Sequence, residues 1–137
     1  MNNIIFKYIN YLYFFSILVI LIFYLFPGDI VTYFIYGEFK HNVGVKHDIV
    51  GSSVHWIINT GGYSINHTII FFYVTLTGLY FIFKKNLLIG VTTFILFSII
   101  LELLHFIIPN RAFEFIDLIS NLVGVILAII FFYKFKK

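Results

Sequence analysis

The amino-acid sequence predicts an all-α integral membrane protein with four transmembrane helices and a short interfacial helix in its first outer loop. Composition is the first indication: 61% of the 137 residues are hydrophobic and only 11% are charged, whereas apolar residues make up about half of a globular chain. Four apolar stretches approach the roughly 20 residues that a helix needs to cross a bilayer core. The only long polar stretch, residues 27–64, separates the first two of these stretches.

Each predicted helix is bounded by recognisable signals. The first is too long for the apolar core of a signal peptide, and no Ala precedes Ala112 to mark a small-residue cleavage site, so we expect a retained helix. Lys84 and Lys85 form the turn between the second and third helices, and Pro109 breaks the third. Residues 1–137 then form a single membrane domain. The helices are predicted at residues 4–26, 65–83, 87–108 and 115–133.

The segment from His47 to His67 is too short and too polar to span a membrane. Its scattered aliphatic residues and the single Trp56 are typical of an amphipathic helix that lies in the membrane interface. Gly61 and Gly62 would then form the turn into the second transmembrane helix. We therefore expect one short interfacial helix in the first outer loop.

Basic residues favour the cytoplasmic side of a membrane protein. With four spans, both chain ends and the turn at Lys84 and Lys85 lie on one side. That side carries six of the nine Lys and Arg residues, and the other side carries three. We therefore expect a protein of the cell (plasma or inner) membrane with both termini in the cytoplasm. The six are Lys7, Lys84, Lys85, Lys134, Lys136 and Lys137, and the three are Lys40, Lys46 and Arg111.

The acidic residues and the histidines all fall in the outer loops or in the outer parts of the predicted helices. Every side chain suited to acid, base or ligand chemistry at neutral pH is therefore expected toward the outer face. The acids are Asp29, Glu38, Asp48, Glu102, Glu114 and Asp117, and the histidines are His41, His47, His55, His67 and His105.

The densest polar pattern lies in residues 102–124, around the turn between the third and fourth helices. Glu102 and His105 are three residues apart and share one face of the third helix. Asp117 begins a stripe on the fourth helix that continues four and seven residues later. Because charges at membrane depth almost always pair, we expect Arg111 to pair with Glu102 or Asp117 across the turn. The candidate polar site is Glu102, His105, Arg111, Asp117, Asn121 and Gly124, with Glu114, Asn66 and His67 as secondary candidates.

The pattern Glu102-x2-His105-x3-Pro109-x-Arg111-x5-Asp117-x3-Asn121-x2-Gly124 resembles the signature of the VanZ-like family, with His105 where that family usually has Gln. The resemblance is weaker over residues 66–78. There the family's second helix opens with Asp-Lys followed by His and Tyr, and this chain has other residues at all four positions. The resemblance implies a four-helix membrane protein from a family linked to low-level resistance to glycopeptide antibiotics such as teicoplanin. Those four positions carry Asn66, His67, Ile70 and Val74.

Some classes of function are disfavoured. The net charge of +3 comes from scattered Lys residues, so nucleic acid is not an expected partner. The chain has no Cys, and the spacing of its histidines matches no local zinc pattern. We therefore expect no metal site and no cofactor.

Several interpretations of the polar pattern remain open. It could be a structural clasp between two helices, but it contains more polar groups than a clasp needs, so we favour a functional site. The favoured function is binding of an envelope component, such as a lipid headgroup or cell-wall precursor, or of another membrane protein. The alternative is an intramembrane enzyme acting on a lipid-linked substrate, with Glu102 or Asp117 as general base, His105 as acid or base and Arg111 as electrostatic stabiliser. Ser120, the nearest nucleophile, points away from the stripe.

Overall fold

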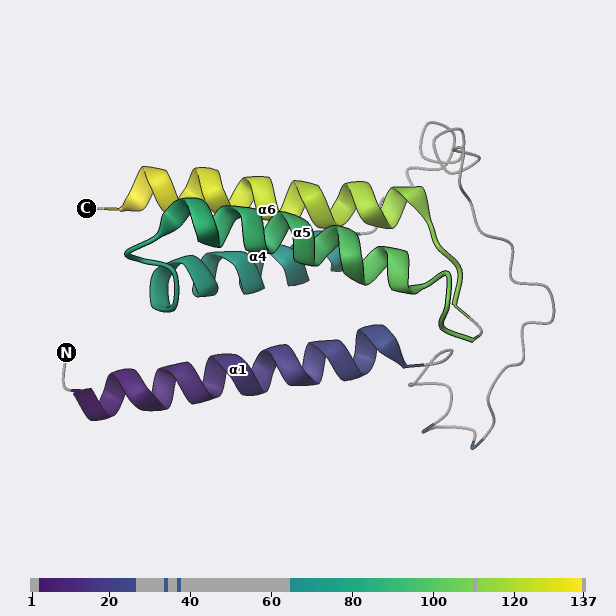
Figure 1. Cartoon of the computed structure of the whole chain (residues 1–137), viewed down its shortest axis with the longest axis horizontal. Coiled ribbons are helices and arrows are strands. Elements are labelled where there is room, and N and C mark those ends of the chain that lie inside the picture. The colour runs from purple at the N-terminus through teal and green to yellow at the C-terminus, as the bar shows by residue number, and fades with distance from the viewer. Residues whose placement is uncertain (1–2, 27–33, 35–36, 38–64, 110, 137) are drawn as a thin grey trace.

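The computed structural model describes residues 3–26, 34, 37, 65–109 and 111–136. Within these residues the chain forms four α-helices that alternate in direction (Figure 1). The interfacial helix expected between residues 27 and 64 falls outside the described residues. The four helices are α1 (Asn3–Leu25), α4 (Ile65–Phe81), α5 (Leu87–Leu104) and α6 (Phe115–Phe135).

Three of these helices are long and apolar enough to cross a membrane: α5, α6 and residues Lys7–Leu25 of α1. The fourth, α4, has 17 residues and is also apolar. Large apolar side chains cover the outside of the bundle; Leu88, for example, is 80% exposed and Leu12 is 68% exposed. Such a surface is suited to lipid, because in water it would be a large uncovered apolar patch. The chain is a multi-pass helical membrane protein.

The third expected helix ends four residues early, at Leu104 and not at residue 108. The amide of His105 donates to the carbonyl of Glu102 at 3.1 Å, and the next two amides also bond three residues back. The helix therefore tightens into a 3₁₀-type turn before Pro109, which disfavours helical geometry in the residue before it. The second expected helix ends at Phe81 and not at residue 83, and the fourth continues to Phe135, two residues beyond its expected end.

The most extensive helix contact joins α4 and α6. It centres on Gly124, where an added Cβ would lie 3.0 Å from Phe71 Cβ and from the amide nitrogen of Phe72, and closer still to the carbonyl oxygen of Thr68. Gly124 therefore allows α4 and α6 to approach each other closely. Around this contact lies a core of buried apolar side chains: Tyr24, Phe71, Val74, Leu79, Phe94, Leu101, Val125 and Phe132.

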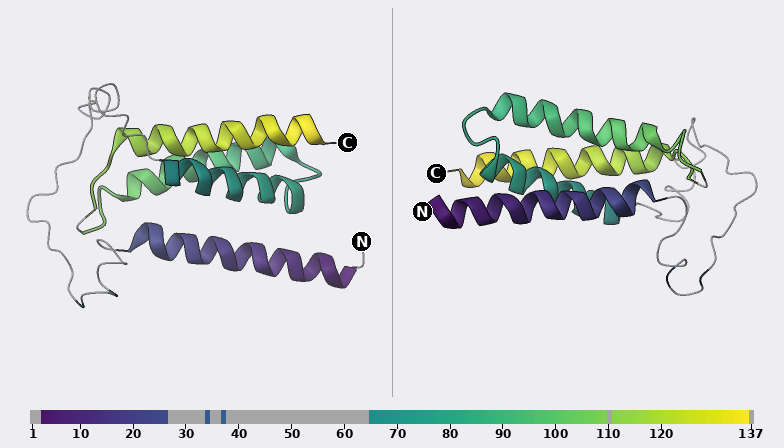
Figure 2. Two further views of the ribbon diagram at one scale, coloured as in Figure 1. Left: turned by 180° about the vertical axis from the view of Figure 1, so that it is seen from behind. Right: turned by 60° about the horizontal axis from the view of Figure 1, so that its bottom comes forward.

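The two ends of the bundle differ in chemistry. The chain termini and the α4–α5 turn at Lys84 and Lys85 lie at one end, which we call the termini end (Figures 1 and 2). The opposite end holds the last turns of α1 and α5 and the first turns of α4 and α6, and we call it the polar end. This common placement of the termini and the Lys turn agrees with the expected topology; the side of the membrane on which they lie stays a prediction.

Candidate functional site

At the polar end, one side chain from each of the four helices joins a single hydrogen-bonded network. The hydroxyl of Tyr24 on α1 lies at its centre, 2.8 Å from Asn121 Nδ2, 3.1 Å from Glu102 Oε2 and 2.9 Å from His67 Nδ1. These partners belong to α6, α5 and α4. We call the set the polar cluster; it consists of Tyr24, His67, Glu102, His105, Asp117 and Asn121.

The contacts of the Tyr24 hydroxyl determine which nitrogen of His67 carries a proton. The hydroxyl has one proton, which it donates to Glu102, and it accepts a hydrogen bond from the Asn121 amide. Toward His67 it can therefore only accept. His67 Nδ1 also lies 3.1 Å from Asn121 Oδ1, which is another acceptor. Both contacts require the proton on Nδ1, so in the neutral ring the lone pair of His67 is on Nε2.

Glu102 is completely buried, and three donors surround its carboxylate. In addition to the Tyr24 hydroxyl, the backbone amide of Glu114 lies 3.2 Å from Oε1 and His105 Nδ1 also lies 3.2 Å from Oε1. His105 Nε2 faces the carbonyl oxygen of Tyr24 at 3.3 Å, so Nε2 carries a proton. The contact between Nδ1 and Oε1 needs a second proton, on the ring or on the carboxyl.

Asp117 lies at the edge of the polar cluster, in the first turn of α6. Its Oδ2 is 3.6 Å from His67 Nε2, and both side chains are about one-fifth exposed, at 18% and 21%. The positive end of the helix dipole favours a carboxylate at this position. The expected stripe on α6 places Asp117 next to His67, Asn121 within the network and Gly124 one turn deeper against α4.

The expected pairing of Arg111 with Glu102 or Asp117 is wrong: the hydrogen bonds that the structure shows for the Arg111 side chain go to backbone carbonyls at the end of α1. Arg111 Nε donates to the carbonyl oxygen of Phe26 at 3.0 Å, and Nη2 donates to that of Phe23 at 2.9 Å. The last carbonyls of a helix have no partner within the helix and attract positive charge. The side chain therefore caps α1. Glu102 Oε1 lies 3.2 Å from His105 Nδ1, and Asp117 Oδ2 lies 3.6 Å from His67 Nε2.

A cavity of about 390 Å³ opens beside the polar cluster, between α1 and α4. Its polar lining comes from Asn66, His67, His105 and Arg111, and its apolar lining includes Val19, Phe23 and Ile70. It therefore offers both hydrogen-bonding groups and a hydrocarbon wall. Such a combination is typical of a ligand pocket.

Of the secondary candidates, His67 lies at the centre of the network and Asn66 lines the cavity. Glu114 contributes its backbone amide to Glu102, and its side chain is exposed. Ser120 lies outside the polar cluster, because its hydroxyl donates to the carbonyl of Ile116 at 2.8 Å.

Sequence reasoning missed Tyr24. In a chain with ten Tyr residues, one more near a helix end resembles an ordinary interfacial anchor. The available signal was depth, since the predicted topology places Tyr24 on the same side of the membrane as Glu102 and Asp117. Burial distinguishes it: Tyr24 is 7% exposed, whereas Tyr8 and Tyr11 on the same helix are 68% and 59% exposed.

Comparison of the chain with protein-family models, with curated proteins and with solved structures finds no match.

Proposed function

We propose that this membrane protein is VanZ-like and binds an anionic envelope component, such as a lipid headgroup or a lipid-linked cell-wall precursor, at an outward-facing polar end. The observation that carries the proposal is the cavity between α1 and α4, with Arg111, His67 and His105 at its polar wall and apolar side chains along α1 and α4. An amphiphile with a negative head and a hydrocarbon tail has the matching chemistry.

Arg111 is the residue proposed to contact the anionic head. Its guanidinium has five N–H donors in a planar array, and the carbonyls of α1 take two of them. The group can therefore hold α1 in place and contact a phosphate or carboxylate at the same time. Glu102 orients His105, and Tyr24 and Asn121 orient His67. By the VanZ-like resemblance, loss of this binding would reduce tolerance to glycopeptide antibiotics.

Lipid binding tests the proposal directly. Purified chain in a non-ionic detergent is titrated with phosphatidylglycerol, and the bound lipid is counted by native mass spectrometry. Loss of a charge-assisted contact should weaken binding by about tenfold or more in Arg111→Gln. Lys134→Gln, which removes an exposed charge in the last turn of α6, is the matched control and should bind as the parent does. Equal binding by both variants would refute the proposal.

A cellular measurement is independent of the choice of lipid. Arg111→Ala is expected to lower tolerance to a teicoplanin-type antibiotic while Lys134→Ala leaves it unchanged, with protein abundance measured in each strain. If Arg111→Ala changes neither susceptibility nor abundance, a role of this site in the envelope is excluded.

The alternative function, an intramembrane enzyme, draws support from the two acid–histidine pairs at the polar end. Both nitrogens of His105 are already used, by Glu102 and by the Tyr24 carbonyl, so neither is available to exchange a proton with a substrate. The Ser120 hydroxyl is bonded to its own helix. Binding is therefore the better-supported function. Turnover of a labelled lipid-linked precursor by purified chain, abolished in Glu102→Gln, would reverse that order.

A further inference from the structure

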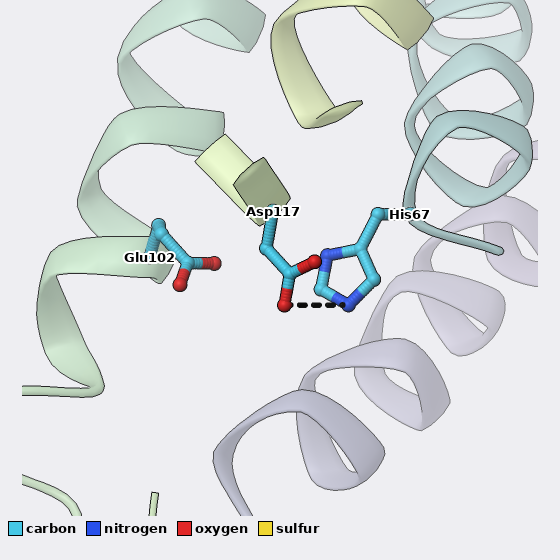
Figure 3. A group of neighbouring side chains, drawn as sticks. All are labelled: His67, Glu102 and Asp117. Carbon is cyan, nitrogen blue, oxygen red and sulfur yellow. Dashed lines mark ion pairs between the residues drawn. The ribbon is translucent and has the colours of Figure 1, made fainter. Parts of the chain in front are cut away.

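Three side chains of the polar cluster together have the chemistry of a metal site. His67, Glu102 and Asp117 come from α4, α5 and α6, and each offers one ligand atom within 4.8 Å of the other two. Figure 3 shows the imidazole and the two carboxylates pointing toward one another. Imidazole nitrogen and carboxylate oxygen are both established ligands of Zn²⁺ in proteins.

The tautomer of His67 is the one that a metal ligand needs. Tyr24 Oη and Asn121 Oδ1 both hold the proton on Nδ1, and the lone pair on Nε2 then points toward Asp117. Histidines that bind metals almost always donate their other ring N–H to an oxygen, which fixes the ring orientation. Here Asn121 and Tyr24 supply those oxygens. His67 is therefore oriented for coordination.

The distances between the ligand atoms are compatible with a bound ion. The 3.6 Å between His67 Nε2 and Asp117 Oδ2 exceeds an N–H···O hydrogen bond, which is about 2.7–3.2 Å. Two ligand atoms at about 2.0–2.1 Å from a tetrahedral ion are about 3.4 Å apart. The widest separation in the set is 4.8 Å, so binding would draw the ligands slightly inward. His67 and Asp117 are partly exposed and can rotate to do so.

Glu102 retains capacity for a ligand bond. A carboxylate has about four acceptor positions, and the Tyr24 hydroxyl, His105 and the Glu114 amide occupy three of them. The remaining position is on Oε2. A divalent cation between the Glu102 and Asp117 oxygens would interact favourably with both side chains.

We propose that His67, Glu102 and Asp117 bind one divalent transition-metal ion, with Zn²⁺ as the preferred ion, and that Asn121 and Tyr24 position His67. The imidazole favours Zn²⁺ over Mg²⁺ or Ca²⁺, which prefer oxygen ligands alone. Three protein ligands leave the fourth tetrahedral position for water. This metal site shares a wall with the proposed headgroup cavity through His67, but it does not depend on headgroup binding.

The test is metal binding by the full chain in a non-ionic detergent, without anionic lipid. The protein is stripped with a chelator and dialysed against Zn²⁺ alone, and bound metal is measured by mass spectrometry. We expect one Zn²⁺ per chain, with affinity reduced by about tenfold or more in His67→Gln and in Asp117→Asn. Glu114→Gln, an exposed carboxylate on the same side of the bundle, is the matched control and should bind Zn²⁺ as the parent does.

Thermal unfolding provides the second readout. Zn²⁺ should raise the melting temperature of the parent and of Glu114→Gln, and at the same concentration it should raise that of Asp117→Asn by less. His67 and Asp117 are only partly buried, so their variants are expected to fold. Parent protein that binds no Zn²⁺, or variants that both bind it with parental affinity, would overturn the metal site. Because no anionic lipid is present, either result leaves the headgroup proposal to its own titration.

Discussion

Replacing Tyr24 by Phe removes one oxygen atom from the bundle and with it three hydrogen bonds, to Glu102, Asn121 and His67. The bond to the buried carboxylate is charge-assisted and contributes about 1.5–3 kcal/mol. Each of the other two joins helices within the membrane, where such bonds average about 0.6 kcal/mol. We therefore expect Tyr24→Phe to lower the free energy of unfolding by about 3–4 kcal/mol.

Tyr13→Phe is the matched control for this prediction. Tyr13 lies on the same helix, is equally buried, and makes a single bond from its hydroxyl to the carbonyl of Val74 at 3.1 Å. Loss of this hydrogen bond should lower the free energy of unfolding by about 0.6 kcal/mol. Both variants are unfolded in mixed micelles with increasing sodium dodecyl sulfate, and helix content is followed by circular dichroism. If Tyr24→Phe is no less stable than Tyr13→Phe, Tyr24 is not the centre of the network.

Three further predictions use the same unfolding measurement. Gly124→Ala should lower stability by about 1–3 kcal/mol, because the new methyl group meets the backbone of α4; unchanged stability would mean that α4 and α6 are further apart than described. Thr75→Val should be neutral or stabilising, because the buried Thr75 hydroxyl has no hydrogen-bond partner among the described residues; Thr68→Val, which removes the 2.9 Å bond to the Ser120 carbonyl, should be destabilising. Glu102→Ala should cost about 3–5 kcal/mol, since it leaves three donors unpaired; a loss below about 1 kcal/mol would contradict a paired buried carboxylate.

Hydropathy alone identified the four helices, because lipid requires long apolar segments whose backbone bonds are satisfied internally. It was less accurate at the ends of helices. The third helix ends at Leu104 because the chain tightens before Pro109, and a count of apolar residues does not register that change. Helical spacing placed Asp117, Asn121 and Gly124 on one stripe of α6, and they lie there.

Partners across helices were harder to predict. Local spacing joins residues on one helix, such as Glu102 and His105, and that contact is present. Local spacing does not indicate which side chains of α1 contact side chains of α5 and α6. The sequence therefore led us to pair Arg111 with a carboxylate, although its side chain caps α1. For the same reason Tyr24 was overlooked as a partner of Glu102. The expectation of no metal site considered only the spacing of histidines, whereas the cluster at His67 combines one histidine with carboxylates from two other helices.

The network around Tyr24 also has a consequence for the order of assembly. Tyr24 lies on α1, its partner His67 follows 43 residues later, and its partners Glu102 and Asn121 follow 78 and 97 residues later. Before α5 and α6 are in place, α1 can already contact α4, through the Tyr24 hydroxyl and His67 and through the Tyr13 hydroxyl and the carbonyl of Val74. The network around Tyr24 is therefore completed in two stages, first with α4 and then with α5 and α6.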